Sequence, residues 1–295
     1  MRRLAPMAPT SAALGAHPAD RLVDAIARRD APVCVGLDPV IDRMPASLAA
    51  RPAAAALEAF SIAVIGACAA HVPAVKFQSA CYERYGADGV AALRTSIEAA
   101  RQRGLVAILD AKRGDIGISA AHYAAAASSL GADWITASGY MGPDTLTPFL
   151  EAGLGAFVLV RTSNEGSDAL QALRLADGRT VAEAVADMVE EMGAARCGTH
   201  GMSQLGAVVG ATKPADGAAL RARLKRTMLL VPGYGAQGGT LADIRPLFGD
   251  SGRDAIVTAS RSVIYAFDKA DPHYASAIAR ASEALAREIR EGLRA

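Results

Sequence analysis

One short hydrophobic run of the chain ends in charged residues that could take part in a single reaction. The run continues as Asp110-Ala111-Lys112-Arg113-Gly114-Asp115, in which Asp110 and Lys112 are two positions apart. Alternate side chains of a β-strand lie on one face, so a strand here points both groups the same way. An ammonium group held beside a carboxylate can donate a proton and stabilise developing negative charge. We therefore expect general acid chemistry at this position.

Two other hydrophobic runs contribute a charged residue each. Asp38 follows one of them, and Lys76 lies within another. A structural ion pair between Asp110 and Lys112, with Asp115 as the N-cap of a helix that begins nearby, is the alternative to a reactive cluster. Because burying several ionised groups is costly and an apolar core is often as stable, we favour the functional interpretation.

A second group of residues has the character of a phosphate site. Pro232–Gly239 is rich in glycine and leads toward a helix, and Arg261 follows the last hydrophobic run. Glycines allow backbone N–H groups to approach phosphate oxygens, and an arginine adds a bidentate contact. The alternative is a glycine-rich connection with a surface arginine. Together the two groups predict a phosphorylated substrate anchored at one end and met by lysines and aspartates at the other.

Eight short hydrophobic runs predict the strands that would carry these groups. Alanine-rich helical segments separate them, and successive runs begin about 32 residues apart, the size of one βαβ unit. The predicted strands are Val33–Leu37, Ala74–Gln78, Val106–Asp110, Trp134–Ala137, Ala156–Arg161, Leu205–Val209, Met228–Val231 and Ala255–Thr258. Eight units predict a single (β/α)8 barrel, with an open doubly wound sheet as the alternative. In such a barrel the functional groups lie at the carboxyl ends of the strands.

The remaining segments complete the predicted organisation. A helix from about Pro18 to Arg28 should close the bottom of the barrel, ahead of the first strand. Residues 1–16 are expected to be a flexible tail, and residues 17–295 a single catalytic domain. The longest interval between strands predicts an insertion at 164–179 and a loop at 196–204.

Composition excludes several other classes of protein. The chain has 295 residues, 21% of them charged, and a net charge of +1, which gives no electrostatic basis for binding nucleic acid or a membrane surface. Its four cysteines form no CxxC pair, so we expect reduced thiols and a cytoplasmic location. Cys197 and His200 have the spacing of two metal ligands, but no second pair is near, and we expect no metal site.

With Lys76 one strand before the motif from Asp110 to Gly117, the sequence resembles the orotidine 5′-phosphate decarboxylase family, in particular its longer bacterial subgroup. The resemblance extends from Val33 to about Ala266 and includes the glycine-rich turn and the arginine described above. It implies decarboxylation of orotidine 5′-phosphate to uridine 5′-phosphate, the last step of de novo pyrimidine nucleotide synthesis. It also implies that the enzyme needs no cofactor and is a homodimer.

The resemblance assigns roles to individual residues. Lys112 would protonate C6 of the pyrimidine, with Asp110 between Lys76 and Lys112, and Asp115 with Ile116 would reach into the active site of the other subunit. The other substrate-binding residues are Asp38 for a ribose hydroxyl, Ser163 (or its neighbour Thr162) for the pyrimidine edge, Gln237 and Arg261 for the phosphate, and Ser119, Pro232 and Gly238.

Two other functions are compatible with parts of this pattern. A related barrel decarboxylase that acts on a sugar acid phosphate with Mg²⁺ resembles the chain at the Asp-x-Lys-x-x-Asp motif, but it carries an acidic metal ligand where this chain has Lys76. A cation at that position opposes a metal. A barrel that senses a nucleotide without catalysis is the other alternative. Product formation from orotidine 5′-phosphate distinguishes all three.

Overall fold

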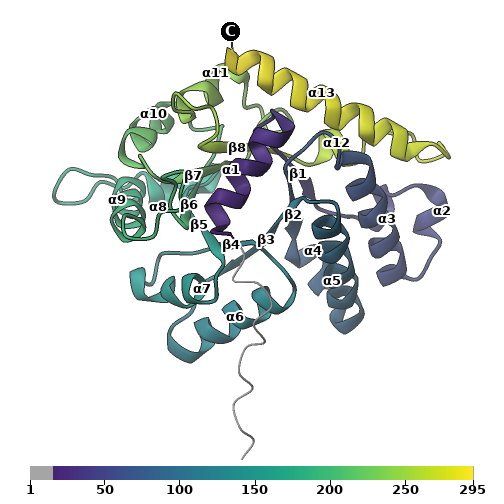
Figure 1. Ribbon diagram of the computed structural model, residues 1–295, viewed down its shortest axis with the longest axis horizontal. Coiled ribbons are helices and arrows are strands. Elements are labelled where there is room, and N and C mark those ends of the chain that lie inside the picture. Colours follow the sequence, from purple (N-terminus) through teal and green to yellow (C-terminus); the bar gives the residue numbers. More distant parts are fainter. Residues whose placement is uncertain (1–15, 295) are drawn as a thin grey trace, which may run out of the picture.

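The computed structural model describes residues 16–294 and shows a closed barrel of eight parallel strands, in the order β1 to β8 (Figure 1). The strands are β1 Val33–Leu37, β2 Ala74–Gln78, β3 Val106–Arg113, β4 Trp134–Ala137, β5 Gly155–Arg161, β6 Leu205–Val209, β7 Met228–Val231 and β8 Ala255–Ala259. The pairing of β1 with β8 closes the sheet, so the predicted (β/α)8 barrel is confirmed and the open sheet is wrong.

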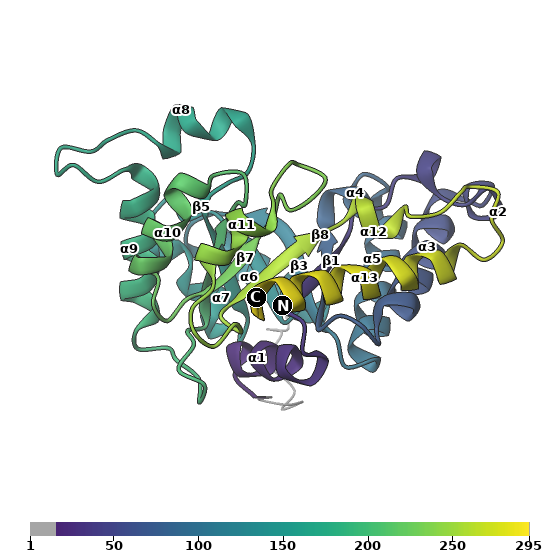
Figure 2. The ribbon, with the colours of Figure 1, turned by 90° about the horizontal axis from the view of Figure 1, so that it is seen from above.

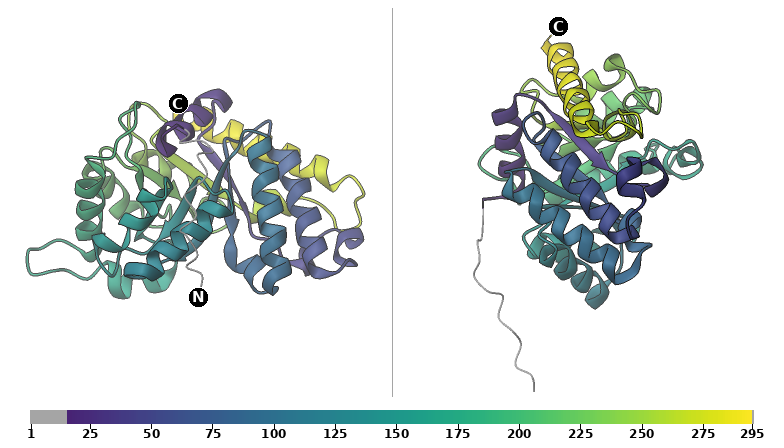
Figure 3. Two further views of the ribbon diagram at one scale, coloured as in Figure 1. Left: turned by 60° about the horizontal axis from the view of Figure 1, so that its bottom comes forward. Right: turned by 90° about the vertical axis from the view of Figure 1, so that its right-hand side faces the viewer.

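Helices surround the barrel and connect its strands. Figure 3 shows α3 and α5 side by side on the outside of the sheet. The α-helices are α1 Pro18–Arg29, α2 Ala46–Ala49, α3 Ala53–Cys68, α4 Ser79–Glu83, α5 Gly86–Gln102, α6 Gly117–Ser129, α7 Thr147–Glu151, α8 Asp168–Gln171, α9 Val181–Gly193, α10 Pro214–Arg223, α11 Leu241–Ile244, α12 Arg261–Ile264 and α13 Tyr274–Arg294. Short 3-10 turns lie at Ile41–Arg43, Pro143–Thr145, Glu165–Ser167 and Arg245–Leu247. No helix in the described part of the chain is both long enough and apolar enough to span a membrane.

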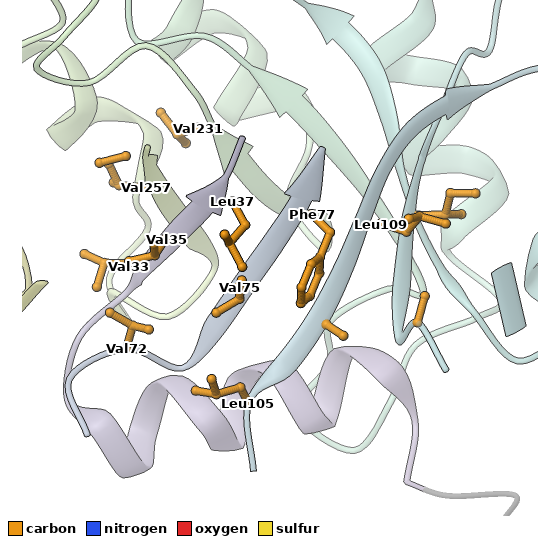
Figure 4. Packing of buried hydrophobic residues seen from close by; sticks show 14 of the residues in the cluster. Val33, Val35, Leu37, Val72, Val75, Phe77, Leu105, Leu109, Val231 and Val257 are labelled. Atoms are coloured by element: carbon orange, nitrogen blue, oxygen red, sulfur yellow. The ribbon is translucent and has the colours of Figure 1, made fainter. Parts of the chain in front are cut away.

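The hydrophobic strand residues face two separate cores. Val35, Leu37 and Phe77, which Figure 4 shows on their strands, belong to the core that also contains the helix residues Leu57 and Phe60. Their neighbours on the other face fill the barrel interior, where the rings of Trp134 and Phe157 stack with centroids 4.3 Å apart. Because both faces are buried, the strands read as continuous hydrophobic runs.

The first helix closes the amino-terminal end of the barrel, as predicted (Figure 2). Its buried residues Leu22 and Ile26 pack on the interior core, and Trp134 Nε1 donates a hydrogen bond to the Pro18 carbonyl over 3.2 Å. An ion pair of 2.6 Å joins Arg21 to Asp133. The helix ends one residue later than expected. The predicted tail, residues 1–16, lies outside the described residues except for residue 16.

The predicted insertion and the predicted loop each have their own local structure. The insertion at 164–179 contains a 3-10 turn and α8, and an antiparallel bridge joins Arg174 to Thr180. The loop at 196–204 is folded back on itself by a bridge between Cys197 and Ser203. The first segment lies at the carboxyl ends of the strands, and the second contacts α1 at the opposite end.

Candidate active site

A cavity of about 600 Å³ opens at the carboxyl ends of the barrel strands. Its wall comes from several strands and the connections that follow them, which is where barrels of this kind carry their functional groups. The predicted site residues that line it are Asp38, Lys76, Asp110, Lys112, Ser163, Pro232, Gln237 and Arg261. The structure therefore brings together residues that are up to 223 positions apart in the chain.

Two lysines share one carboxylate on the floor of the cavity. Lys76 Nζ lies 2.6 Å from Asp110 Oδ2, and Lys112 Nζ lies 2.5 Å from Asp110 Oδ1. Asp38 Oδ1 is 3.8 Å from Lys76 Nζ and extends the row by one more charge. The order along the row is carboxylate, ammonium, carboxylate, ammonium. Each charge therefore has a neighbour of opposite sign.

Lys76 and Asp110 keep their charges although both are buried. Only 9% of Asp110 and 6% of Lys76 is exposed. Burial by itself raises the pKa of Asp110, but the flanking ammonium groups outweigh burial and lower this pKa to about 2. For Lys76, burial favours the neutral form, whereas Asp110 and Asp38 favour the charged form and leave its pKa above the usual value. At neutral pH the pair is therefore ionised.

Two polar oxygens beside this row have no hydrogen-bond partner among the described residues. They are Asp38 Oδ1 and Thr258 Oγ1, both buried atoms of residues that line the cavity. A buried polar group without a partner is destabilising, and a ligand hydroxyl can provide one. Both oxygens are therefore available to a polar group of a ligand at the β1 and β8 side of the cavity.

The turn after β7 builds the adjoining part of the cavity wall, because β7 pairs with β8. Gly233, Gly235 and Gly238 have φ values of 97°, 67° and 94°, a backbone conformation that side chains disfavour. The turn is closed by a hydrogen bond of 3.1 Å from the Gly239 N–H to the Gly233 carbonyl. It presents Gln237 to the cavity, facing the start of α12 where Arg261 lies. An amide and a guanidinium group at one end of a cavity can hold a phosphate.

Known proteins share both this sequence and this architecture. The family model described as orotidine 5′-phosphate decarboxylase / HUMPS family matches residues 31–272. This chain belongs to that family. The orotidine 5′-phosphate decarboxylase of Rhodopirellula baltica is 40% identical over 267 residues, covering 84% of this chain and 88% of the relative.

Two solved structures support the family membership through the fold. A crystal structure from Streptomyces avermitilis, assigned to orotidine 5′-phosphate decarboxylase, has a TM-score of 0.80 and is 35% identical in sequence. The match covers 95% of this chain and 97% of the chain in that structure. The orotidine 5′-phosphate decarboxylase of Leishmania donovani has a TM-score of 0.77 and 34% identity, with coverage of 94% and 99%.

Four of the residues that the family resemblance assigned to the site do not line the cavity of this chain. Gly238 belongs to the glycine-rich turn but does not face the cavity, and Asp115, Ile116 and Ser119 lie between β3 and the first turns of α6. Asp115 Oδ1 accepts a hydrogen bond of 2.8 Å from the N–H of Ile116, and no side chain caps α6. The alternative role of Asp115 as the N-cap of this helix is therefore wrong.

Sequence reasoning missed two threonines of the site. Thr136 on β4 donates a hydrogen bond of 2.9 Å to Asp110 Oδ1, and Thr258 on β8 also lines the cavity. A single hydroxyl in each otherwise apolar strand was the available signal. It was not decisive, because threonine is common in strands for its shape alone.

Proposed function

We propose that the row of lysines and aspartates carries out the decarboxylation of orotidine 5′-phosphate to uridine 5′-phosphate, with Lys112 as the proton donor and without a cofactor. The observation that carries this assignment is the single buried carboxylate of Asp110, which holds Lys76 and Lys112 on its two oxygens. The membership in the orotidine 5′-phosphate decarboxylase family supports the substrate.

The dimensions and chemistry of the cavity orient the nucleotide. In this proposal Gln237 and Arg261 hold the phosphate, and the unpartnered Oδ1 atom of Asp38 accepts a hydrogen bond from a ribose hydroxyl. Ser163 contacts the edge of the pyrimidine. Its hydroxyl makes no hydrogen bond within the described chain, whereas the hydroxyl of Thr162 is already bonded to Asn164 over 2.8 Å. This difference favours Ser163 over its neighbour.

The reaction breaks the bond between C6 and the carboxylate carbon. The electron pair remains on C6 as CO₂ departs, and the Lys112 ammonium group first stabilises this negative charge and then donates its proton to C6. Lys112 regains a proton from solvent. Asp110 keeps the two lysines in place, and its charge opposes the substrate carboxylate, since two such charges about 4 Å apart repel by about 4 kcal/mol at an effective dielectric of 20.

We further propose that the active enzyme is a homodimer with its sites at the subunit interface. Apolar side chains around Asp115 are unusually exposed, with 60% of Ile116, 75% of Ile118 and 80% of Tyr140 accessible. The connections after β3 and β4 adjoin each other, because a Cβ built on Gly114 would lie 3.1 Å from the Ser138 side chain. A surface of this kind is typical of an interface. Asp115, Ile116 and Ser119 of one subunit would then complete the site of its partner.

The cysteines support a cytoplasmic location for the enzyme. All four are free, and Cys34 and Cys68 are buried. Burial raises the pKa of each of these two thiols to about 12, so they stay protonated. Free thiols of this kind are typical of proteins in a reducing compartment.

A decarboxylation assay under chelation tests the proposed reaction against its rivals. Purified protein is incubated with orotidine 5′-phosphate in EDTA, and uridine 5′-phosphate is quantified. We expect full turnover, because Lys76 stands where metal-dependent relatives place an acidic ligand. Absence of uridine 5′-phosphate, with turnover of a sugar acid phosphate that EDTA stops and Mg²⁺ restores, would favour the sugar-acid decarboxylase. Tight binding of the nucleotide without product would favour the sensor.

A further inference from the structure

The pairing of β3 with β4 is irregular where β3 carries the catalytic row. Between Leu109 and Arg113, four residue steps on β3 face only the two steps from Ile135 to Ala137 on β4. A bulge of this kind leaves backbone groups of the longer strand without partners in the ladder and changes the direction of its side chains. Asp110 and the proposed proton donor Lys112 both lie in this bulge.

The backbone of Lys112 is strained within the bulge. Its φ is 47°, and Asp30 is the only other non-glycine residue with positive φ in the described part of the chain. A lysine in this left-handed region costs about 1–2 kcal/mol relative to the usual conformations. It persists only where the surrounding structure holds it, and such strain is concentrated at functional sites.

Thr136 supplies the contacts that hold this conformation. It is 2% exposed and lies on β4 opposite the bulge. Its Oγ1 atom accepts a hydrogen bond of 2.9 Å from the N–H of Lys112 and donates one of 2.9 Å to Asp110 Oδ1. One hydroxyl group therefore binds the backbone of the proton donor and the carboxylate that this donor contacts.

We propose that Thr136 is a positioning residue that fixes the bulge of β3 so that the Lys112 ammonium group is held against Asp110 and over the cavity. The inference rests on the proposed function, because the geometry that it explains is that of the decarboxylating row. Thr136 acts through Lys112 and Asp110, since its one hydroxyl proton is committed to Asp110.

Two substitutions separate the hydroxyl of Thr136 from its shape. Thr136→Val keeps the branched side chain but loses both hydrogen bonds, whereas Thr136→Ser keeps the hydroxyl and loses a methyl group. For Thr136→Val we expect kcat to fall on the order of tenfold to a hundredfold, the effect of a small misplacement of a reacting group. KM for orotidine 5′-phosphate and Kd for uridine 5′-phosphate should stay within about threefold, because the binding contacts lie elsewhere. Thr136→Ser should recover most of kcat.

Thr227→Val is the matched control. Thr227 is also fully buried, and its Oγ1 donates a hydrogen bond of 2.9 Å to Glu190 Oε2. It precedes β7 at the end of the barrel away from the cavity, so its loss tests the general effect of removing a buried hydroxyl. We expect kcat near the wild-type value for this variant.

Crystal structures of the two Thr136 variants provide a readout that does not depend on turnover. In Thr136→Val the φ of Lys112 should leave the left-handed region, and in Thr136→Ser it should remain there. If wild-type protein forms no product, the proposed function fails, but this structural comparison still tests the role of Thr136. If Thr136→Val does not fold, Thr136→Ala is measured in its place with the same expectations.

Three results would overturn the proposal. The first is a hydroxyl-free variant at position 136 with wild-type kcat and an unchanged Lys112 backbone. The second is a folded Thr136→Ser protein as slow as the hydroxyl-free variant. The third is an equal loss of kcat in Thr227→Val, which would make the effect one of general stability.

Discussion

Lys76 keeps a positive charge at a place where burial alone would lower the pKa of its ammonium group. It is almost fully buried, and its stability as a cation depends on Asp110 and on the more distant Asp38. Removing either partner of a buried ion pair leaves an uncompensated charge, which is far more costly than a missing surface contact. Lys76 and Asp110 are therefore a unit, in which the charge of each depends on the other.

The phosphate end of the cavity can be tested at a single residue. Arg261→Ala should lower kcat/KM for orotidine 5′-phosphate far more than for the bare nucleoside orotidine. The guanidinium contact exists only with the phosphate. The measurement is kcat/KM for each of the two substrates. Equal losses for both would show that Arg261 does not bind the phosphate.

At the level of elements, the strands were more predictable than the contacts between them. Runs such as Val33–Leu37 and Leu205–Val209 match the structure to the residue, because strands buried on both faces must be hydrophobic throughout. The third strand is longer than predicted and ends at Arg113, because Thr136 and the bulge extend the pairing beyond the hydrophobic run. A contact between side chains on two strands leaves no periodic signal in either one.

In the candidate site, too, single residues were more predictable than the contacts between distant segments. Asp110, Lys112 and Lys76 were predictable because charges at the end of a hydrophobic run are conspicuous. The hydrogen bond from the Tyr234 hydroxyl to Glu288 on α13, which connects the glycine-rich turn to the last helix, was not predictable. It joins residues that only the closed barrel brings together.

The loop at 196–204 has a structural explanation that leads to a prediction at the element level. Asp20 on α1 accepts hydrogen bonds from the Thr199 N–H (2.8 Å), the Thr199 hydroxyl (2.9 Å) and the His200 N–H (3.0 Å). Asp20→Ala should lower the free energy of unfolding by about 2–4 kcal/mol, because it removes three hydrogen bonds to a buried carboxylate, and hydrogen bonds to a charged group contribute more than neutral ones. Turnover should be unchanged, since α1 closes the end of the barrel opposite the cavity.

A neighbouring aspartate provides the control for this measurement. Asp24 is on the same helix and pairs with the imidazole of His200 over 2.8 Å, but both side chains are largely exposed. Its replacement by alanine should cost less than about 1 kcal/mol in denaturant unfolding. Equal effects of the two substitutions would mean that the hydrogen bonds of Asp20 do not hold the loop.

For the whole molecule, the proposed dimer places Lys112 and Asp115 of one site on different chains. Lys112→Ala and Asp115→Ala proteins, each inactive alone, are unfolded together in equal amounts and refolded. In a mixed dimer one site carries both lesions and the other carries neither, and with random pairing half of the dimers are mixed. About a quarter of the wild-type activity should therefore return.

The control for the mixing experiment is the exchange of subunits itself. Differently tagged chains of the two variants should co-purify after joint refolding. If they exchange and no activity returns, Asp115 serves its own chain, and the exposed apolar surface around Ile116 has another role.

The most direct test of the account is the loss of the single proton donor. Lys112→Ala is assayed for conversion of orotidine 5′-phosphate to uridine 5′-phosphate, and its affinity for uridine 5′-phosphate is measured in parallel. We expect turnover to be abolished while the product still binds, because the ammonium group is needed chiefly in the transition state. A variant that retains more than about a hundredth of the wild-type rate would contradict the assignment, since a general acid contributes at least that much.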